Sequence, residues 1–180
     1  QLRSWVRNST AGLLKAKKIV GLVGGDHSTP LGFLDALAAI HSDFGILQID
    51  AHCDLRDAYE GFRYSHASIM FNALTLPQIS KLVQVGIRDF CKAEVELIDN
   101  SKQRIKTFFD ADLKSDSYQG KSWKAQCGEI VQQLPQKVYI SFDIDGLDPK
   151  LCPNTGTPVP GGLEYEQAVF LIREVVHSGR

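Results

Sequence analysis

Five short apolar runs limit what this chain can fold into. Each run is rich in Val, Ile or Phe and lacks polar alternation, which is typical of strands buried on both faces of a sheet. The runs cover residues 19–24, 44–49, 82–87, 105–110 and 138–143. Helical patterns cover residues 2–16, 31–40, 92–100, 122–134 and 164–177. Strands that alternate with helices predict an α/β fold, here a three-layer α/β/α sandwich with a parallel, doubly wound sheet.

The composition narrows the class of protein. The chain has 180 residues, 43% hydrophobic and 23% charged, which suffices for one domain with its own core. A net charge of −1 without a basic cluster argues against nucleic acid or a membrane surface as a partner. No apolar stretch approaches the ~20 residues that a membrane-spanning helix needs. The four cysteines form no CxxC pair, so we expect reduced thiols and a cytoplasmic location.

Helical or strand patterns reach almost to both ends of the sequence. The chain begins with Gln1 rather than Met, and it ends at Arg180 directly after a helical pattern. We therefore expect a single domain over residues 1–180 that is incomplete at both ends.

Metal-ligating residue types follow three of the five apolar runs. They are His27, Asp50, His52, Asp54, Asp143 and Asp145. Ligands of open α/β sheets bind beyond the carboxyl ends of the strands, where these residues lie. Because alternate side chains of an extended chain share a face, we expect Asp50, His52 and Asp54 to converge, with Cys53 pointing away and packing. The same spacing predicts that Asp143 and Asp145 lie on one face.

Single aspartates after strands have a simpler interpretation. Most are turn or N-cap residues, which is how we interpret Asp26 and Asp148. His41 and His177 lie near predicted helix C-termini, where a histidine suits the helix dipole, and we assign them no role. Turn chemistry does not explain why three separate strand ends all carry ligand-type residues.

The charge of the set predicts more than one metal ion. Four carboxylates at one pole of a sheet would repel one another and raise each other's pKa values unless cations neutralise them. Two divalent ions balance four carboxylates, and an oxygen-rich set with some imidazole favours Mn²⁺ over Zn²⁺. Two ions about 3.5–4 Å apart activate a shared water for hydrolysis. We therefore expect hydrolysis at a polarised carbon or phosphorus.

At these residues the sequence resembles the ureohydrolase family of arginases and agmatinases. The matching motifs are GGDHS (24–28), DAHCD (50–54), SFDIDGLDP (141–149) and TGTPVPGGL (155–163). The resemblance implies a three-layer α/β/α fold and a site for two Mn²⁺ ions. One ion would be held by His27, Asp50, Asp54 and Asp143, and the other by Asp50, His52, Asp143 and Asp145. Asp50 and Asp143 would then bridge the two ions.

The resemblance also implies a reaction. A hydroxide that bridges the ions would attack a guanidinium carbon, and His66 would give the leaving amine its proton. The stretch from residue 50 to residue 68 is closest to the agmatinase version. The implied activity is therefore hydrolysis of agmatine to putrescine and urea, a step of polyamine biosynthesis. Family members are commonly trimers or hexamers, so a homo-oligomer is implied, with a small guanidino compound as substrate.

One position departs from the family pattern. Many members have a Glu four residues after GGL that holds the guanidinium, and this chain has Gln167 there. An amide oxygen accepts a hydrogen bond but carries no charge. Glu164 and Glu166 lie nearby, although acidic residues in a first helical turn also have a purely local explanation.

Several alternatives stay open from the sequence. Guanidinobutyrase, arginase or formimidoylglutamase activity would need the same metal residues. An amide hydrolase or a two-metal phosphoesterase would also fit a similar sheet, the latter with Arg56, Arg63 and Arg88 as phosphate contacts. An inactive, metal-binding relative is the third class, and Gln167 is the feature that favours it.

Overall fold

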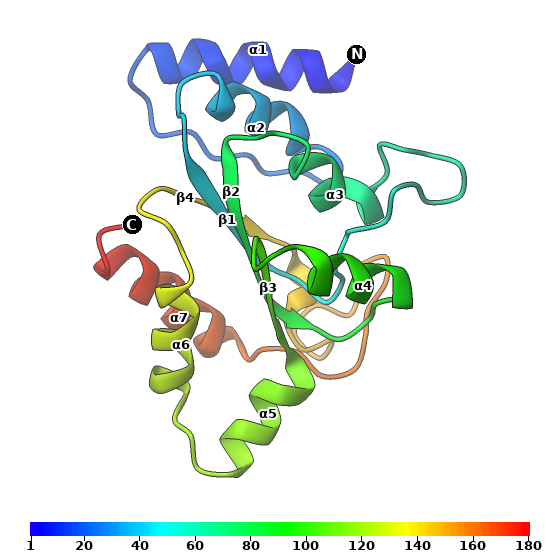
Figure 1. The fold of residues 1–180 in the computed structure, drawn as a ribbon, viewed down its shortest axis with the longest axis vertical. Helices are drawn as coiled ribbons and strands as arrows, with labels where there is room; N and C mark the ends of the chain where they lie inside the picture. Colours follow the sequence, from blue (N-terminus) through cyan, green and yellow to red (C-terminus); the bar gives the residue numbers. More distant parts are fainter. The chain divides into compact units, whose positions relative to one another are not determined.

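The computed structural model describes residues 1–180 and contains seven α-helices, two short 3₁₀ helices and four strands. In chain order they are α1 (Leu2–Lys15), α2 (Leu31–Ala38), β1 (Phe44–Ile49), η1 (His66–Ser68), α3 (Ile69–Ala73), β2 (Ile79–Ile87), α4 (Lys92–Asn100), β3 (Ile105–Phe109), α5 (Asp110–Tyr118), α6 (Trp123–Gln132), β4 (Val138–Phe142), η2 (Ile144–Gly146) and α7 (Tyr165–His177). Figure 1 labels the α-helices and the strands. None of the helices is long and apolar enough to cross a membrane.

The chain divides into two compact units, each described by itself. The helical unit comprises residues 1–43 and 54–79, with α1, α2, η1 and α3. The sheet unit comprises residues 44–53 and 80–180. In the helical unit, α1 and α2 pack so closely that a Cβ on Gly32 would lie 2.3 Å from the carbonyl oxygen of Arg3. An ion pair between Arg3 and Asp35, 2.6 Å from Nε to Oδ2, joins the same two helices.

The sheet unit is built on four hydrogen-bonded strands in the order β3-β2-β1-β4. The β1–β4 and β2–β3 pairs are parallel, with Ile49 opposite Phe142 and Val85 opposite Phe108. Every residue of β1 is buried. Buried β-branched and other apolar side chains suit a central strand, as the sequence predicts.

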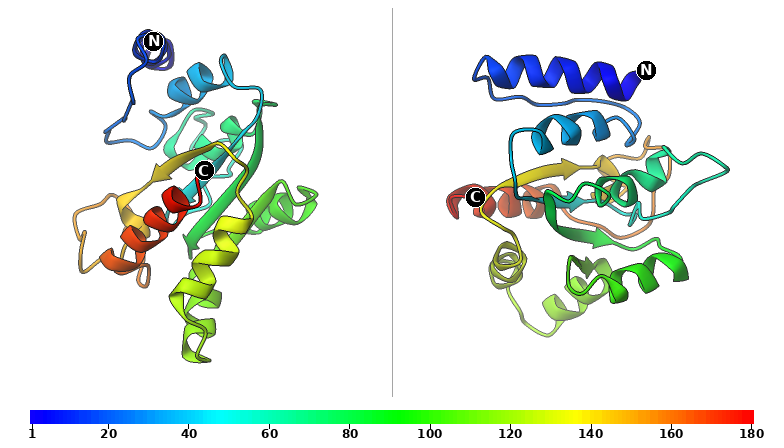
Figure 2. Two further views of the ribbon diagram at one scale, coloured as in Figure 1. Left: turned by 90° about the vertical axis from the view of Figure 1, so that its left-hand side faces the viewer. Right: turned by 45° about the horizontal axis from the view of Figure 1, so that its top comes forward.

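Helices cover both faces of this sheet. The α4 connection runs from β2 outward to β3, whereas α5 and α6 lead back across the sheet to β4. Because parallel crossovers are right-handed, the two connections lie on opposite faces. Figure 2 shows α6 and α7 together on one side of the strands and α4 on the other. The core under α6 and α7 includes Leu47, Val85, Cys127, Ile130 and Leu171. The predicted α/β class with a parallel sheet and flanking helices is confirmed.

The predicted strand at residues 19–24 is wrong. These residues form no helix or strand, and Ile19 and Val23 are fully exposed. A strand needs neighbouring backbone groups to pair with, and this segment belongs to the helical unit, which contains no sheet. The apolar composition of this segment therefore predicted a strand that the structure does not contain.

Helices predicted from periodicity agree with the structure to within two residues at each end. Two helices were not expected from the sequence. The five residues of α3 are too few to display a helical period, and α5 has Leu113 as its only buried apolar residue. The predicted strand 105–110 also ends one residue early, because Asp110 begins α5.

Candidate metal centre

Three ligand-type side chains of the sheet unit meet where β1 and β4 end. Asp50, His52 and Asp145 each offer one ligand atom, and these atoms all lie within 4.8 Å of one another. His52 Nδ1 lies 3.2 Å from Asp145 Oδ2 and 3.5 Å from Asp50 Oδ1. Asp50 and Asp145 are buried, with only 1% and 5% of their surface exposed. Two desolvated carboxylates around one imidazole form a strongly cation-attracting group.

The backbone at the strand ends explains this convergence. β4 ends at Phe142, and the next residue, Asp143, donates its backbone N–H to Ile49 O at 2.9 Å. The chain then turns through η2, which directs the Asp145 carboxylate at β1, where its Oδ1 accepts a 3.1 Å hydrogen bond from Ala51 N. The two aspartates of the D-x-D pair are therefore brought together with β1 by a turn.

This finding corrects the expected geometry. Strand alternation does not extend to residue 54, because β1 ends at Ile49 and Asp54 has a left-handed φ of 54°. A non-glycine residue with positive φ carries strain, which is tolerated best by Asp and Asn and is typical of functional sites. Asp54 belongs to the helical unit, whereas Asp50 and His52 belong to the sheet unit.

The electrostatics of the cluster favour positive charge on His52. Hydrogen bonding to Asp145, and then to Asp50, raises the pKa of His52 to about 10, although burial acts in the opposite direction. At neutral pH a proton is thus held at the imidazole between two carboxylates. A divalent cation would satisfy the same carboxylates and would require a neutral imidazole.

Asp143 lies beside this cluster. Its carboxylate accepts a 3.2 Å hydrogen bond from Asp145 N, which caps η2. Asp143 and Asp50 also offer carboxylate oxygens within 4.8 Å of one another. The four predicted ligands of the sheet unit are therefore neighbours, with Asp143 completing the set.

The remaining candidates lie in the helical unit. His27 Nδ1 is 2.8 Å from Asp54 Oδ2, so these two predicted ligands are in contact. His66 begins η1 and is about half exposed, with its Nδ1 3.6 Å from Asp26 Oδ2. Its ring also makes an edge-on contact with Tyr59, at 5.5 Å between centroids. A carboxylate beside Nδ1 is a common way to orient an imidazole.

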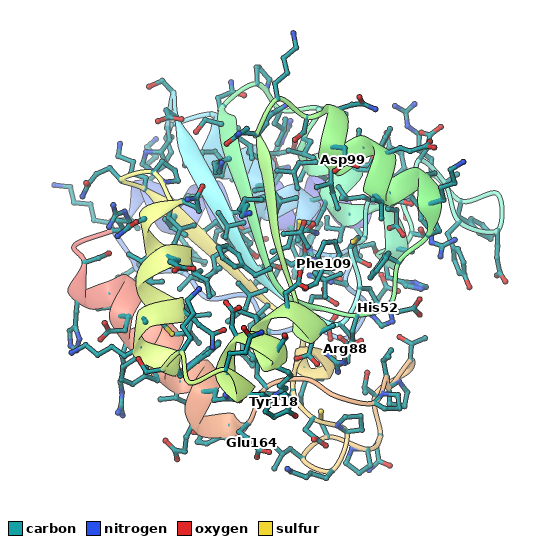
Figure 3. The ribbon with its side chains drawn as sticks, turned by 60° about the horizontal axis from the view of Figure 1, so that its bottom comes forward. His52, Arg88, Asp99, Phe109, Tyr118 and Glu164 are labelled. Atoms are coloured by element: carbon teal, nitrogen blue, oxygen red, sulfur yellow. The ribbon has the colours of Figure 1, made fainter.

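Two further sequence-based expectations concern Cys53 and Gln167. Cys53 is buried, and its expected packing is confirmed. Gln167 lies in the first turn of α7, where its Oε1 accepts a 2.9 Å hydrogen bond from Glu164 N as part of a capping box. Figure 3 shows Glu164 well separated from His52. The structure therefore gives Gln167 a local capping role that the sequence interpretation did not include.

Arg88 is a residue whose role the sequence did not reveal. Its guanidinium donates to the carbonyl oxygens of Gly86, Asp145, Leu147 and Val159 at 2.6–3.1 Å. Figure 3 places it beside His52 at one end of the sheet. With its donors occupied in this way, Arg88 ties the 155–163 loop to η2 and is not an open phosphate contact.

Comparisons with known proteins identify the family of this chain. The profile of the Arginase family matches residues 4–180. The chain belongs to the arginase family. Its N(1)-aminopropylagmatine ureohydrolase relative from Thermus thermophilus is 37% identical over 170 residues, which cover 94% of this chain and 54% of the relative. The guanidinobutyrase of Pseudomonas aeruginosa is 32% identical over 154 residues, covering 84% of this chain and 47% of that enzyme.

Solved structures of the family share the fold. The agmatine ureohydrolase of Thermoplasma volcanium superimposes with a TM-score of 0.79 at 28% identity, covering 97% of this chain and 56% of that one. The chain thus spans about half the length of the relatives that it matches. Within that half it contains the four motifs that the sequence analysis singled out.

Proposed function

We propose that this protein is a manganese-dependent ureohydrolase that cleaves the guanidino C–N bond of agmatine and releases urea and putrescine. The observation that carries the proposal is the buried cluster of Asp50, His52 and Asp145 at the strand ends. Membership in the arginase family supports the same reaction class. A phosphoesterase receives less support, because Arg88, one of the arginines considered as a phosphate contact, is engaged with backbone carbonyls.

The donor set fits two manganese ions. Carboxylate oxygens with a minority of imidazole nitrogens are ligands that Mn²⁺ accepts, and no thiolate is offered, since Cys53 is packed in the interior. Asp50, His52, Asp143 and Asp145 of the sheet unit would hold metal, and His27 and Asp54 complete the proposed set. When bound, the ions would supply a nucleophile from water at neutral pH.

The other steps belong to the chain's own residues. We assign His66 the delivery of a proton to the leaving amine nitrogen, because an amine is a poor leaving group until it is protonated. Asp26, next to His66 Nδ1, would hold the imidazole in orientation so that Nε2 faces the substrate. Gln167 is proposed as a guanidinium contact on the family resemblance alone, since in this structure its Oε1 accepts from Glu164 N in the capping box of α7.

The choice of substrate rests on charge and on the relatives. Agmatine is a dication, and the acidic cluster at the strand ends would attract it. A second candidate is N(1)-aminopropylagmatine, because the Thermus relative named for that substrate is 37% identical over 94% of this chain. Both compounds carry the same guanidinium, so the same metal residues would serve either.

Two expectations about the whole protein accompany the proposal. We propose a cytoplasmic location, for which the four free cysteines are suited. We also propose a homo-oligomer, which analytical ultracentrifugation of the purified protein would test directly.

The test is urea release by the Mn²⁺-loaded protein from agmatine, N(1)-aminopropylagmatine, arginine and 4-guanidinobutyrate. We expect turnover of one or both agmatine compounds and little from the two carboxylate-bearing ones. The variant His66→Ala should lose about 10²–10⁴-fold in kcat while it still binds Mn²⁺, as expected for a general acid. No urea from any compound by protein with bound Mn²⁺ would reject the proposal.

A further inference from the structure

Two glutamines lie in the middle of the sheet, where neither meets solvent. Gln48 of β1 and Gln84 of β2 are both 0% exposed, and Thr107 of the next strand, β3, is 9% exposed. Gln48 is the only polar residue of β1, and Gln84 lies within the apolar part of β2. Burying an amide without hydrogen bonds costs the folded state several kcal/mol, roughly 2–7 depending on the reference state. These three side chains therefore need partners within the sheet unit.

Their partners are one another. Thr107 Oγ1 donates to Gln84 Oε1 at 2.8 Å, and Gln84 Nε2 donates to Gln48 Oε1 at 2.7 Å. Gln48 Nε2 then donates to Asp50 Oδ2 at 2.8 Å. The result is a hydrogen-bond chain across three neighbouring strands that ends on a carboxylate of the proposed metal centre.

The second hydrogen of each amide is used as well. Gln84 Nε2 also donates to Cys53 O at 2.7 Å, and Gln48 Nε2 also donates to His52 O at 3.1 Å. The backbone that follows β1 is thus held at two carbonyls, while Asp50 Oδ1 accepts from His52 N at 2.8 Å. Both carboxylate oxygens of Asp50 are therefore fixed in direction.

The direction of donors and acceptors along this hydrogen-bond chain can be arranged in only one way. Gln48 must present its NH₂ group to Asp50, because its carbonyl oxygen would repel an ionised carboxylate. Its oxygen then faces β2, so Gln84 must present NH₂ as well, and Gln84 Oε1 needs a donor, which Thr107 supplies. The orientation of each member follows from the one before it.

We propose that Thr107, Gln84 and Gln48 are positioning residues that orient the Asp50 carboxylate and thereby set the affinity of the metal centre for divalent cations. This inference rests on the proposed function. Gln84 and Thr107 do not touch a proposed ligand side chain, so they act through Gln48. Outer-shell partners of metal ligands typically change metal affinity by about 10–100-fold when they are removed.

Stability alone does not account for the chain. Replacing buried hydrogen-bonded groups together by apolar ones of the same shape is often nearly neutral or stabilising. Leucine, valine and methionine would fill the same strand positions without any desolvation cost. Apolar side chains at these positions could not donate a hydrogen bond to Asp50 Oδ2, or to the carbonyl oxygens of His52 and Cys53.

The test is the Mn²⁺ dissociation constant, measured from the EPR signal of free Mn²⁺, for Gln84→Met in the purified protein. We expect affinity to weaken at least about tenfold. Gln126→Met is the matched control, because Gln126 is equally buried on α6 and its amide donates to Ser117 Oγ. The control should lose stability but keep the parent affinity.

Three more variants keep the proposal falsifiable if Gln84→Met does not fold. Thr107→Val removes only the first donor and should weaken Mn²⁺ binding, whereas Thr107→Ser keeps the hydroxyl and should restore it. The combined variant Gln48→Met, Gln84→Met, Thr107→Val removes all three polar groups together. It should remain folded by circular dichroism and still bind Mn²⁺ at least about tenfold more weakly.

The outcomes separate this inference from the proposed function. Parent protein that binds Mn²⁺ and releases urea, with variants of equal affinity to the parent, would overturn the positioning role alone. Parent protein that binds no Mn²⁺ would overturn the metal centre and the positioning role together. Weakened binding in Gln84→Met and Thr107→Val, but not in Gln126→Met, supports the inference.

Discussion

At the scale of the residue, Asp145 contributes both to the backbone and to the proposed metal site. Its Oδ1 accepts from Ala51 N at 3.1 Å, while Oδ2 lies 3.2 Å from His52 Nδ1. An asparagine oxygen would keep the first contact and forfeit the charge. This separation of roles makes Asp145 a suitable residue for testing ligand chemistry without unfolding the chain.

We expect Asp145→Asn to lose Mn²⁺ affinity by more than the roughly 10–100-fold that outer-shell losses cause. The physical reason is the loss of one negative charge beside the metal, with the hydrogen bond to Ala51 N retained. Metal content after dialysis measures the effect. Asp148→Asn is the control, since Asp148 belongs to the same motif but its Oδ1 accepts from Lys150 N. Equal losses in both variants would contradict a specific role for Asp145.

A second residue-scale prediction concerns Cys127 in the core under α6 and α7. Burial, with a smaller contribution from Glu174, raises the pKa of Cys127 from its ordinary 9.0 to about 12. The stability that this thiol contributes is therefore complete below pH 9 and is lost progressively as the pH rises toward 12. Urea unfolding at pH 8 and pH 10.5 should show a smaller decrease for Cys127→Ala than for the parent. A decrease of the same size in both proteins would be evidence against this ionisation.

At the scale of the element, the metal centre depends on how closely η2 approaches the end of β1. A Cβ on Gly146 would lie 2.8 Å from Asp50 N and 3.0 Å from Ile49 C. Backbone cannot yield at such distances without shifting the strand end. The D-x-D turn and the D-x-H turn can therefore face each other only with glycine at position 146.

Gly146→Ala should accordingly lower the free energy of unfolding by about 1–3 kcal/mol, as overpacked cores do, and should weaken Mn²⁺ binding. Gly128→Ala in α6 is the opposite control, because nothing lies within 4 Å of the added Cβ. It should be more stable than the parent by about 0.5–1 kcal/mol, since alanine favours a helix. Urea unfolding of the parent protein and of the two variants tests both the predicted loss and the predicted gain of stability. A Gly146→Ala protein as stable as the parent would show that the close approach is not required.

At the scale of the whole molecule, the sequence predicted the sheet unit better than the helical unit. The apolar run of β1 is buried in the sheet, so composition and structure agree there, whereas β4 pairs with β1 but is only partly buried. The run at residues 19–24 has similar composition but forms no strand, because strand formation depends on pairing that composition does not report.

The candidate site shows the same division. Asp50, His52 and Asp145 were identified from their residue types and their place after the strands. The structure shows that these three side chains lie close together. Alternation failed for Asp54, because β1 ends at Ile49 and Asp54 itself has a left-handed φ. The glutamines of β1 and β2 were visible as polar residues inside apolar runs. The network that they form depends on strand order, which the sequence did not reveal.

The most direct test of the account is an Mn²⁺ titration of metal-free protein followed by EPR. We predict two ions for each chain and the spectrum of a magnetically coupled pair, since two ions about 3.5–4 Å apart share bridging ligands. Asp143→Asn should leave at most one ion, without coupling. Binding of a single uncoupled Mn²⁺ to the parent protein, or of none, would contradict the binuclear centre.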